Sequence, residues 1–290
     1  MRARYLILPI LLLALLVSCS AVRVSYDNAG WVLARMAGSY VDMDRGQARA
    51  LKTQLGELHA WHRSEELPRY AELLESAAAR LERGMSHDDV AWAVGVVRAR
   101  YLVLGREAAE GLAPLLMTLT DSQVDRLEQR FAQDNRKFYA AKLPKDPDAA
   151  IRARADWMCD RLADWTGDLT PVQRQRVEDL ARAFPEVPAL RLEDRKRRQA
   201  ELLAALRARP ENPATRARLV TLLADPDAGR GQRYRQTLAA WEAQFIGVMV
   251  ELERSLTARQ RATAVERLRS YAEEFRSMAG QRVALAGAAG

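Results

Sequence analysis

Apolar residues recur every three or four positions along most of this 290-residue chain. One stretch carries Leu51, Leu55 and Leu58, and another carries Val124, Leu127 and Phe131. This period places the apolar residues on one face of an α-helix, whereas a half-buried strand would alternate at every second residue. The sequence has no Asn-Gly hairpin turn and is rich in the helix-forming residues Ala, Leu, Arg and Glu. The pattern predicts an all-α fold, an array of helical hairpins with about nine to ten helices and no significant sheet.

Breaks in this pattern divide the chain. Residues 27–183 form an N-terminal helical region, in which Pro68 predicts a kink or a restart. Residues 190–226 contain a charge-dense helix start and three prolines, which predict a possible inserted subdomain of short helices. Residues 229–279 are predicted to form a long C-terminal helical hairpin packed on the same body. The Gly- and Ala-rich residues 280–290 are predicted to be a flexible tail.

Two glycines lie where the third predicted helix is expected to end. That helix begins near His87, and its apolar pattern predicts an end at about Gly105 or Gly111. The next helix is expected to run from Asp121 to about Lys142.

A Leu-Thr-x-x-Gln pattern marks several expected helix starts. A Thr, Ser or Asp at the N-cap accepts a hydrogen bond from the N3 amide, and a Gln at N3 returns one to the N-cap amide. Each copy is therefore predicted to be a capping box after a tight turn. The three full copies use Thr120 with Gln123, Thr170 with Gln173 and Thr257 with Gln260, and two degenerate copies use Asp44 with Gln47 and Ser86 with Asp89.

Three full copies of this box resemble the motif of the small periplasmic chaperones of the Spy and CpxP type. Those proteins carry two such boxes on a cradle-shaped helical dimer that holds unfolding client proteins. This chain is about twice as long and has more boxes at uneven spacing, and the resemblance covers about a sixth of its residues. The resemblance therefore implies a helical architecture more directly than it implies an activity.

The N-terminus is predicted to carry an export signal. Arg2 and Arg4 precede an apolar run that ends in Leu16-Val17-Ser18-Cys19. The run of thirteen residues contains a proline and is shorter than the roughly 20 residues of a spanning helix. Its end resembles the lipobox of bacterial lipoproteins, although cleavage as an ordinary signal remains an alternative.

This resemblance implies a lipid anchor. Residues 1–18 would be the signal peptide, Cys19 would carry the covalent lipid, and residues 19–26 would form a lipidated tether. Ser20 beside the acylated position implies sorting to the outer membrane, with the body in the periplasm. Two or three acyl chains anchor a protein stably, because each buried methylene contributes about 0.8 kcal/mol.

Three further segments resemble a family of uncharacterised proteobacterial lipoproteins that bears a label of unknown function. The segments are residues 26–31, 61–70 and 131–138, and the similarity extends over most of residues 1–180. The resemblance implies the anchor and the helices, and it brings no catalytic residue.

Composition limits the chemistry. The net charge of +7 falls to +5 when Arg2 and Arg4 leave with the signal, and an exported protein of this mild charge is not expected to bind nucleic acid. Cys159 is the only cysteine besides Cys19, so a disulfide framework is excluded and an inert thiol is expected. The sequence has only three histidines, and it lacks a Gly-x-Ser-x-Gly nucleophile motif and a phosphate-binding loop, so no enzyme activity and no cofactor are predicted.

Two polar groups are candidates for a site. His59, His62 and Glu66 share one helix face and could hold Zn²⁺ or Cu²⁺, or they could be ordinary solvated or ion-paired side chains. Asn135 falls on the apolar stripe of its helix, where a buried polar group must find partners. It is expected to fix helix register or to cap a neighbouring helix.

The expected function follows from these features. The chain is interpreted as an outer-membrane-anchored, non-enzymatic helical lipoprotein that binds envelope proteins in a chaperone-like or scaffold role. The alternative is a metal-binding envelope lipoprotein that uses His59 and His62. The client protein and the oligomeric state stay open.

Overall fold

The computed structural model describes residues 22–142, 146–184, 187–208 and 213–287. The signal peptide, Cys19 and Ser20 lie outside these residues. The all-α prediction is confirmed, because 87% of the described residues are helical and they contain no strand. If the segment from α3 to α4 is counted as one continuous helix, they form ten helices of at least seven residues.

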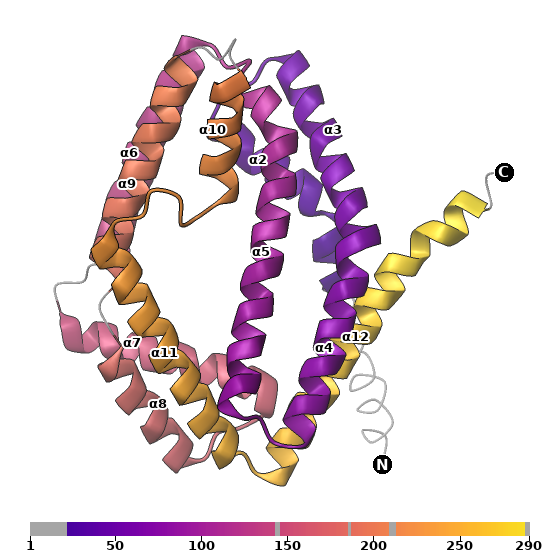
Figure 1. Ribbon diagram of the computed structural model, residues 1–290, viewed down its shortest axis with the longest axis vertical. Helices are drawn as coiled ribbons and strands as arrows, with labels where there is room; N and C mark the ends of the chain where they lie inside the picture. Colours follow the sequence, from indigo (N-terminus) through magenta and orange to yellow (C-terminus); the bar gives the residue numbers. More distant parts are fainter. Residues whose placement is uncertain (1–21, 143–145, 185–186, 209–212, 288–290) are drawn as a thin grey trace, which may run out of the picture.

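The long helices run mainly along the longest axis of the molecule (Figure 1). In the view of Figure 1, α5 lies in the middle, α3, α4 and α12 lie on its right, and α6, α9 and α11 lie on its left. The elements in chain order are α2 (Ala29–Gly38), α3 (Arg45–Trp61), the π-helical turn η1 (His62–Glu66), α4 (Leu67–Glu82), α5 (His87–Leu116), α6 (Asp121–Lys142), α7 (Pro147–Thr166), α8 (Pro171–Ala183), α9 (Pro188–Arg207), α10 (Pro213–Ala224), α11 (Gln232–Ser255) and α12 (Ala258–Gly287).

Three of the packed helix pairs join elements that are not neighbours in the sequence. α12 packs along α4, α10 along α5, and α6 along α9. The expected C-terminal hairpin is therefore not found, since α11 and α12 diverge from their shared turn at the bottom of Figure 1. Their apolar faces have other partners: Ala264 and Val265 of α12 pack on α4, whereas Val248 and Leu252 of α11 pack on α7 and α8.

The packing of the second half of the chain, α7 to α12, repeats that of the first half, α2 to α6. α2 packs on α3 as α7 packs on α8, and α3 contacts α5 as α8 contacts α11. The last helix of each half packs on the other half, α6 on α9 and α12 on α4. The two halves are thus interlocked, with α5 and α10 packed against each other where they meet.

Residues 190–226 belong to this shared body and do not form a separate subdomain of short helices. α9 has 20 residues, and Leu203 and Leu206 join Leu219 of α10 in one core cluster with Val124 and Leu127 of α6. The prolines were misleading because Pro213 begins α10, where a missing amide donor costs nothing.

Helix α5 continues through both glycines at which its end was expected. These glycines lie where other helices approach closely. A Cβ at Gly105 would lie 3.1 Å from the carbonyl oxygen of Ala224, and one at Gly111 would lie 2.7 Å from Oε1 of Gln54. The glycines therefore provide space for α10 and α3 rather than ending the helix.

Pro68 lies just after a distortion of the helix, as predicted. Proline has no amide hydrogen, so the carbonyl four residues earlier loses its usual donor. The chain accommodates this by widening into the π-helical turn η1, and the helix then continues as α4.

The chain is helical at both ends of the described range. Residues 22–26, which belong to the expected tether 19–26, are helical, and α12 extends to Gly287, beyond the start of the expected flexible tail. None of the helices in the described residues combines the length and the apolar character needed to cross a membrane.

Candidate functional site

All five boxes form helix starts in which both capping hydrogen bonds are present. In the Thr170 box, the N-cap amide donates to Oε1 of Gln173 at 2.9 Å, and the Gln173 amide donates to Oγ1 of Thr170 at 3.3 Å. The remaining pairs repeat this geometry, namely Asp44 with Gln47, Ser86 with Asp89, Thr120 with Gln123, and Thr257 with Gln260. Apolar residues before the caps pack as staples, as Leu119 does against the core cluster that contains Val124.

The four glutamines of the boxes pair reciprocally across the fold. Nε2 of Gln47 donates to Oε1 of Gln123 at 3.1 Å, and Nε2 of Gln123 donates back at 2.7 Å. Gln173 and Gln260 exchange the same two bonds at 2.9 and 3.0 Å.

Each of these amides also donates to the carbonyl two residues before its partner's N-cap. Gln47 and Gln123 donate to Thr118 and Asp42. Gln173 and Gln260 donate to Ser255 and Asp168. One glutamine therefore fixes the start of its own helix and the turn before its partner helix.

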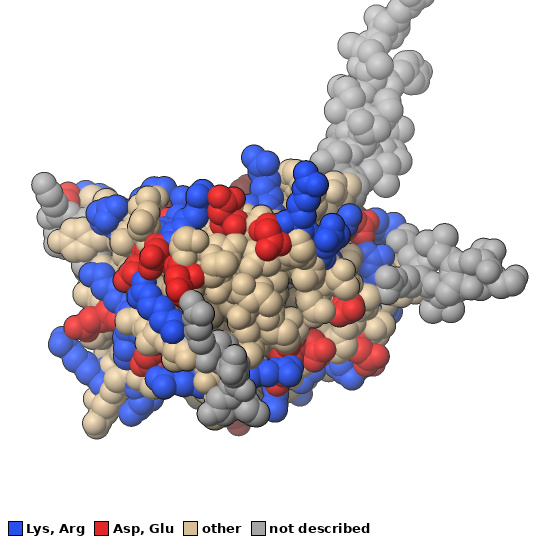
Figure 2. Space-filling model, turned by 90° about the horizontal axis from the view of Figure 1, so that it is seen from above, with Lys and Arg blue, Asp and Glu red and all other residues tan. Residues whose placement is uncertain are grey.

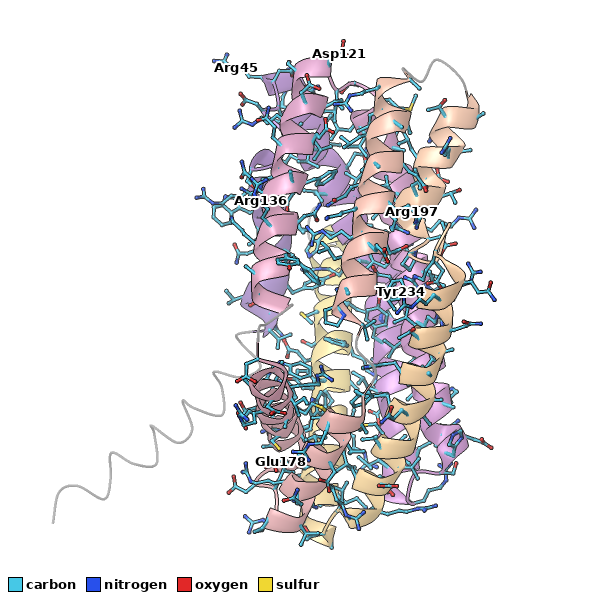
Figure 3. The ribbon with its side chains drawn as sticks, turned by 90° about the vertical axis from the view of Figure 1, so that its left-hand side faces the viewer. Arg45, Asp121, Arg136, Glu178, Arg197 and Tyr234 are labelled. Atoms are coloured by element: carbon cyan, nitrogen blue, oxygen red, sulfur yellow. The ribbon has the colours of Figure 1, made fainter. Side chains whose placement is uncertain are left out.

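The two glutamine pairs lie at opposite ends of the molecule. Arg45 and Asp121, which begin α3 and α6, lie together at the upper end of Figure 3, and Glu178 of α8 lies near the lower end. All four glutamines are buried, so they are closed to a binding partner. These four boxes therefore hold together the turns at the two ends of the molecule.

The fifth box has Asp89 in place of glutamine. Asp89 accepts hydrogen bonds from Arg80 and Arg83, and the bond from Arg83 is 2.9 Å long. Hydrogen bonds from the Ser86 amide and then from Arg80 hold the pKa of this carboxyl well below its usual range. Next to it, Glu253 of α11 accepts from the Met85 amide at 3.1 Å. The turn before α5 is therefore stabilised by charged side chains, whereas the other four boxes use paired amides.

The chain between the expected anchor and α2 is attached firmly to the body. Arg23 donates to Glu274 of α12 at 2.9 Å and to Ser277 at 3.0 Å. The Tyr26 hydroxyl lies 3.0 Å from Nδ1 of His62 on the π-helical turn, and Arg63 lies over the Tyr26 ring at 5.2 Å. Arg63 also pairs with Asp27.

The π-helical turn points Glu66 into the protein, where its side chain is fully buried. Its Oε1 accepts from Nη1 of Arg69 and Nη1 of Arg100, each at 3.1 Å. Burial, with the nearby Glu66 carboxylate, raises the pKa of Tyr70 to about 12. Burial also lowers the pKa of His62, which favours its neutral form.

The predicted metal site is not assembled. His62 contacts the Tyr26 hydroxyl, the Tyr26 ring lies 4.5 Å from that of His59, and Glu66 is bound by two arginines. Among the described residues, no three His, Cys, Asp or Glu side chains are grouped so that they could hold a metal ion. The π-helical turn explains the difference, because it alters the helical register between the histidines and Glu66. His59 and His62 instead contact Tyr26 of the N-terminal segment, whereas Glu66 pairs with arginines of α4 and α5.

Two further residues of interest are structural. Asn135 is half-buried, and its Nδ2 donates to Oε1 of Gln199 on α9 at 2.7 Å, so it links α6 to α9 rather than capping a helix. Cys159 is a free, buried thiol in the core cluster of α7, α8 and α11, and burial raises its pKa.

A cleft of about 410 Å³ lies between α5, α9, α10 and the start of α11. Arg197 and Tyr234, labelled in Figure 3, show how closely α9 and α11 approach beside it. Its lining combines apolar side chains with four arginines and one carboxylate: Tyr101, Arg191, Asp194, Arg195, Arg198, Gln199, Leu202, Leu222, Leu223, Pro226, Arg230 and Tyr234. A second cleft, between α8 and α11, is lined mostly by charged residues.

The arginines of the first cleft are held in place. Arg198 donates to the carbonyls of Asp225, at 2.6 Å, and Leu222, and so caps the end of α10. Arg191 and Arg195 lie over the Phe138 ring at 6.0 and 5.9 Å. The cleft therefore combines leucines and tyrosines with a local excess of positive charge.

The charge elsewhere is mixed. Figure 2 shows the end of the molecule nearest the Gln47–Gln123 pair, where an uncharged area is surrounded by basic and acidic residues in alternation. The positive net charge is therefore not gathered into one basic patch on this face.

Sequence reasoning missed the glutamine pairing, the N-terminal attachment and the cleft. The dense arginines of residues 191–198 were a signal for the cleft, but its leucines come from two helices. The partners in each glutamine pair are 76 and 87 residues apart, so local spacing carries no information about them.

The chain belongs to a family whose model matches residues 39–235, described as Family of unknown function (DUF6279). The match reaches further toward the C-terminus than the expected similarity over residues 1–180, and it begins after the segment 26–31. It includes the cleft residues and the first glutamine pair. No curated protein and no solved structure matches the chain.

Proposed function

We propose that this DUF6279 member is an outer-membrane-anchored periplasmic lipoprotein whose helical body is non-enzymatic and binds other envelope proteins. The observation that carries the proposal is the sequence Leu16-Val17-Ser18-Cys19 after a charged start and an apolar run. Cys19 would carry the lipid, and Ser20 would direct the protein to the outer membrane.

The attachment of residues 23–27 supports this role. Arg23 stands four residues after Cys19 and is already paired with Glu274, and Tyr26 contacts the π-helical turn. A short link of this kind keeps the body close to the membrane and limits its orientation.

The cleft supports protein binding. Tyrosine and arginine are the residue types most often found at the energetic centres of protein interfaces. Tyr101 is 60% exposed, and the leucines beside it offer apolar contact. With four arginines against one aspartate in the lining, the preferred partner is a protein segment that combines apolar and acidic residues.

The resemblance of the boxes to those of the Spy and CpxP chaperones supports a chaperone-like form of this role. Because the box glutamines are buried at the two ends of the molecule, we assign client binding to exposed surfaces such as the cleft. A scaffold role would use the same surfaces with one fixed partner.

Acylation is tested by labelling cells with radioactive palmitate and separating their membranes, using wild type, Cys19→Ser and Ser20→Asp. We expect label and outer-membrane location in wild type and loss of label in Cys19→Ser. Ser20→Asp should keep the label and move to the inner membrane. Cys159→Ser is the matched thiol control and should behave as wild type. Label that persists in Cys19→Ser would refute the anchor.

Partner binding is tested with a photo-crosslinking amino acid at position 101 in cells. The control position is Val172 on α8, which is 65% exposed and lies outside the cleft lining. We expect a discrete adduct from position 101 that Arg191→Glu weakens. The same adducts from both positions, or no effect of Arg191→Glu, would exclude the cleft as the binding surface.

A further inference from the structure

The helix next to the expected anchor has its large apolar residues on the outside. Val24, Trp31, Val32 and Met36 are 59, 67, 42 and 55% exposed. No residue of α2 is fully buried, although only one of its ten residues is charged. This is the reverse of a normal surface helix, which turns large apolar residues toward the core.

Small residues form the inner side of this helix. Ala34 and Ala37 pack against the core cluster formed by Leu51, Leu55 and Leu115, and Gly30 is half-buried. Residues 22–27 continue the same helical path, because the Val32 amide donates to the Asn28 carbonyl and the Asn28 amide to Val24.

Four of the five exposed apolar residues lie on one face, and the fifth, Leu33, is 46% exposed beside the side that contacts the body. At about 100° per residue, Val24, Trp31, Val32, Arg35 and Met36 fall within an arc of about 140°. Arg23, Tyr26, Gly30, Ala34 and Ala37 fall on the opposite side, which is the side that contacts the body. We call the first set the outer face of α2.

Helix α7, which holds the corresponding place in the second half of the chain, differs. It buries Ala155 and Cys159 completely and has Met158 and Leu162 packed against the core. Two tryptophans of α7 are exposed, Trp157 at 63% and Trp165 at 40%, but the Trp165 ring lies 5.6 Å from that of Tyr271 on α12. A broad outer apolar face is therefore a property of α2 and not of the fold position.

We propose that the outer face of α2 lies in the surface of the membrane that holds the anchor, as an interfacial helix in contact with lipid. This inference rests on the proposed acylation of Cys19. Ala29, the first residue of α2, is the tenth residue after Cys19, so the helix begins within about 35 Å of the anchor even if the link is extended. The contacts of Arg23 and Tyr26 then orient its face.

The composition of the outer face fits a lipid surface. Tryptophan is enriched at membrane interfaces, where its ring is apolar and its N–H remains hydrated. The Arg35 guanidinium lies 5.9 Å from the Trp31 ring and can pair with a lipid phosphate. Valine and methionine supply the apolar area that an interfacial helix buries by about 5–10 Å.

The test uses the full mature lipoprotein, purified from membranes in detergent and reconstituted into vesicles of phosphatidylethanolamine and phosphatidylglycerol. Part of the lipid carries bromine on the acyl chains, which quenches nearby tryptophan fluorescence. We expect brominated lipid to quench the wild-type protein, and Trp31→Phe to remove most of that quenching. Trp157→Phe, which removes the more exposed of the two tryptophans of α7, should leave the lipid quenching in place.

Flotation of the same vesicles separates failure of this inference from failure of the anchor. If the protein floats with the vesicles but Trp31→Phe leaves the lipid quenching unchanged, the outer face does not touch lipid and the inference is overturned while the anchor stands. If Trp31 in floated vesicles stays fully open to aqueous acrylamide, the same conclusion holds. If wild type does not float, the proposed anchor and this inference both fail.

Discussion

Replacing Gln173 with methionine tests whether the paired glutamines hold the fold together. Gln173 is 2% exposed, and its side chain makes four hydrogen bonds of 3.0 Å or less that methionine cannot make. It accepts from Thr170 and Gln260, at 2.9 and 3.0 Å, and donates to Gln260 and to the Ser255 carbonyl, both at 2.9 Å. Methionine has a similar volume, so the change removes hydrogen bonds without opening a large cavity.

The expected loss follows from these four bonds. A buried hydrogen bond contributes about 0.5–1.5 kcal/mol net, so Gln173→Met should lower the free energy of unfolding by about 3–4 kcal/mol. Gln260→Met should cost a similar amount, because its bonds mirror those of Gln173. The two bonds between the side chains are lost in either variant, so the double variant should cost about 1–2 kcal/mol less than the sum.

Urea unfolding followed by circular dichroism measures these differences. Gln175→Met is the matched control, since Gln175 lies on the same helix and makes one exposed bond to Asp179 at 3.1 Å. It should change the free energy of unfolding by less than about 0.5 kcal/mol. A loss below about 1 kcal/mol for Gln173→Met, or simple additivity in the double variant, would refute the idea that these glutamines act as a pair.

Two further substitutions test the close contact between α5 and α10 and the hydrogen-bonded carboxylate of Asp89. Gly105→Ala places a Cβ 3.1 Å from the last carbonyl of α10 and should lower the free energy of unfolding, measured in urea, by about 1 kcal/mol. The control Gly95→Ala, on the same helix with open space around it, should raise the free energy of unfolding by about 0.5–1 kcal/mol. Equal effects of the two substitutions would contradict the close contact. Because the pKa of Asp89 is depressed in the folded protein, its contribution to the free energy of unfolding is present above about pH 4 and is lost as the pH falls. Asp89→Asn should therefore weaken the dependence of the free energy of unfolding on pH in the acid range. An acid limb identical to that of wild type would show that Asp89 does not contribute to it.

The bounds of the helices were predictable from the sequence to different degrees. Helix α6 has the predicted bounds, since its apolar stripe and its capping box are local signals. The end of α5 was misjudged because Gly105 is ambiguous without its neighbours, and residues 190–226 were expected to form short helices although α9 has 20 residues. Glycine ends a helix in one context and makes room for another helix in a different one.

The candidate site was less predictable. Glu66 was placed with His59 and His62 by helical spacing, but the π-helical turn directs it to two arginines. The dense arginines of residues 191–198 were the only local signal for the cleft, since Tyr101, Leu202 and Leu222 come from three helices.

By itself the sequence determined the all-α class, the helix starts at the boxes and the apolar run that ends at Cys19, because each depends on residues that are near neighbours in the chain. Only the tertiary structure decided which boxes pair, which helices pack together and which face of α2 stays outside. These depend on contacts between residues tens to hundreds of positions apart. Burial of one helix face fixes how many apolar residues must be covered, but the helix that covers them is chosen by shape and by paired polar groups such as Gln173 and Gln260.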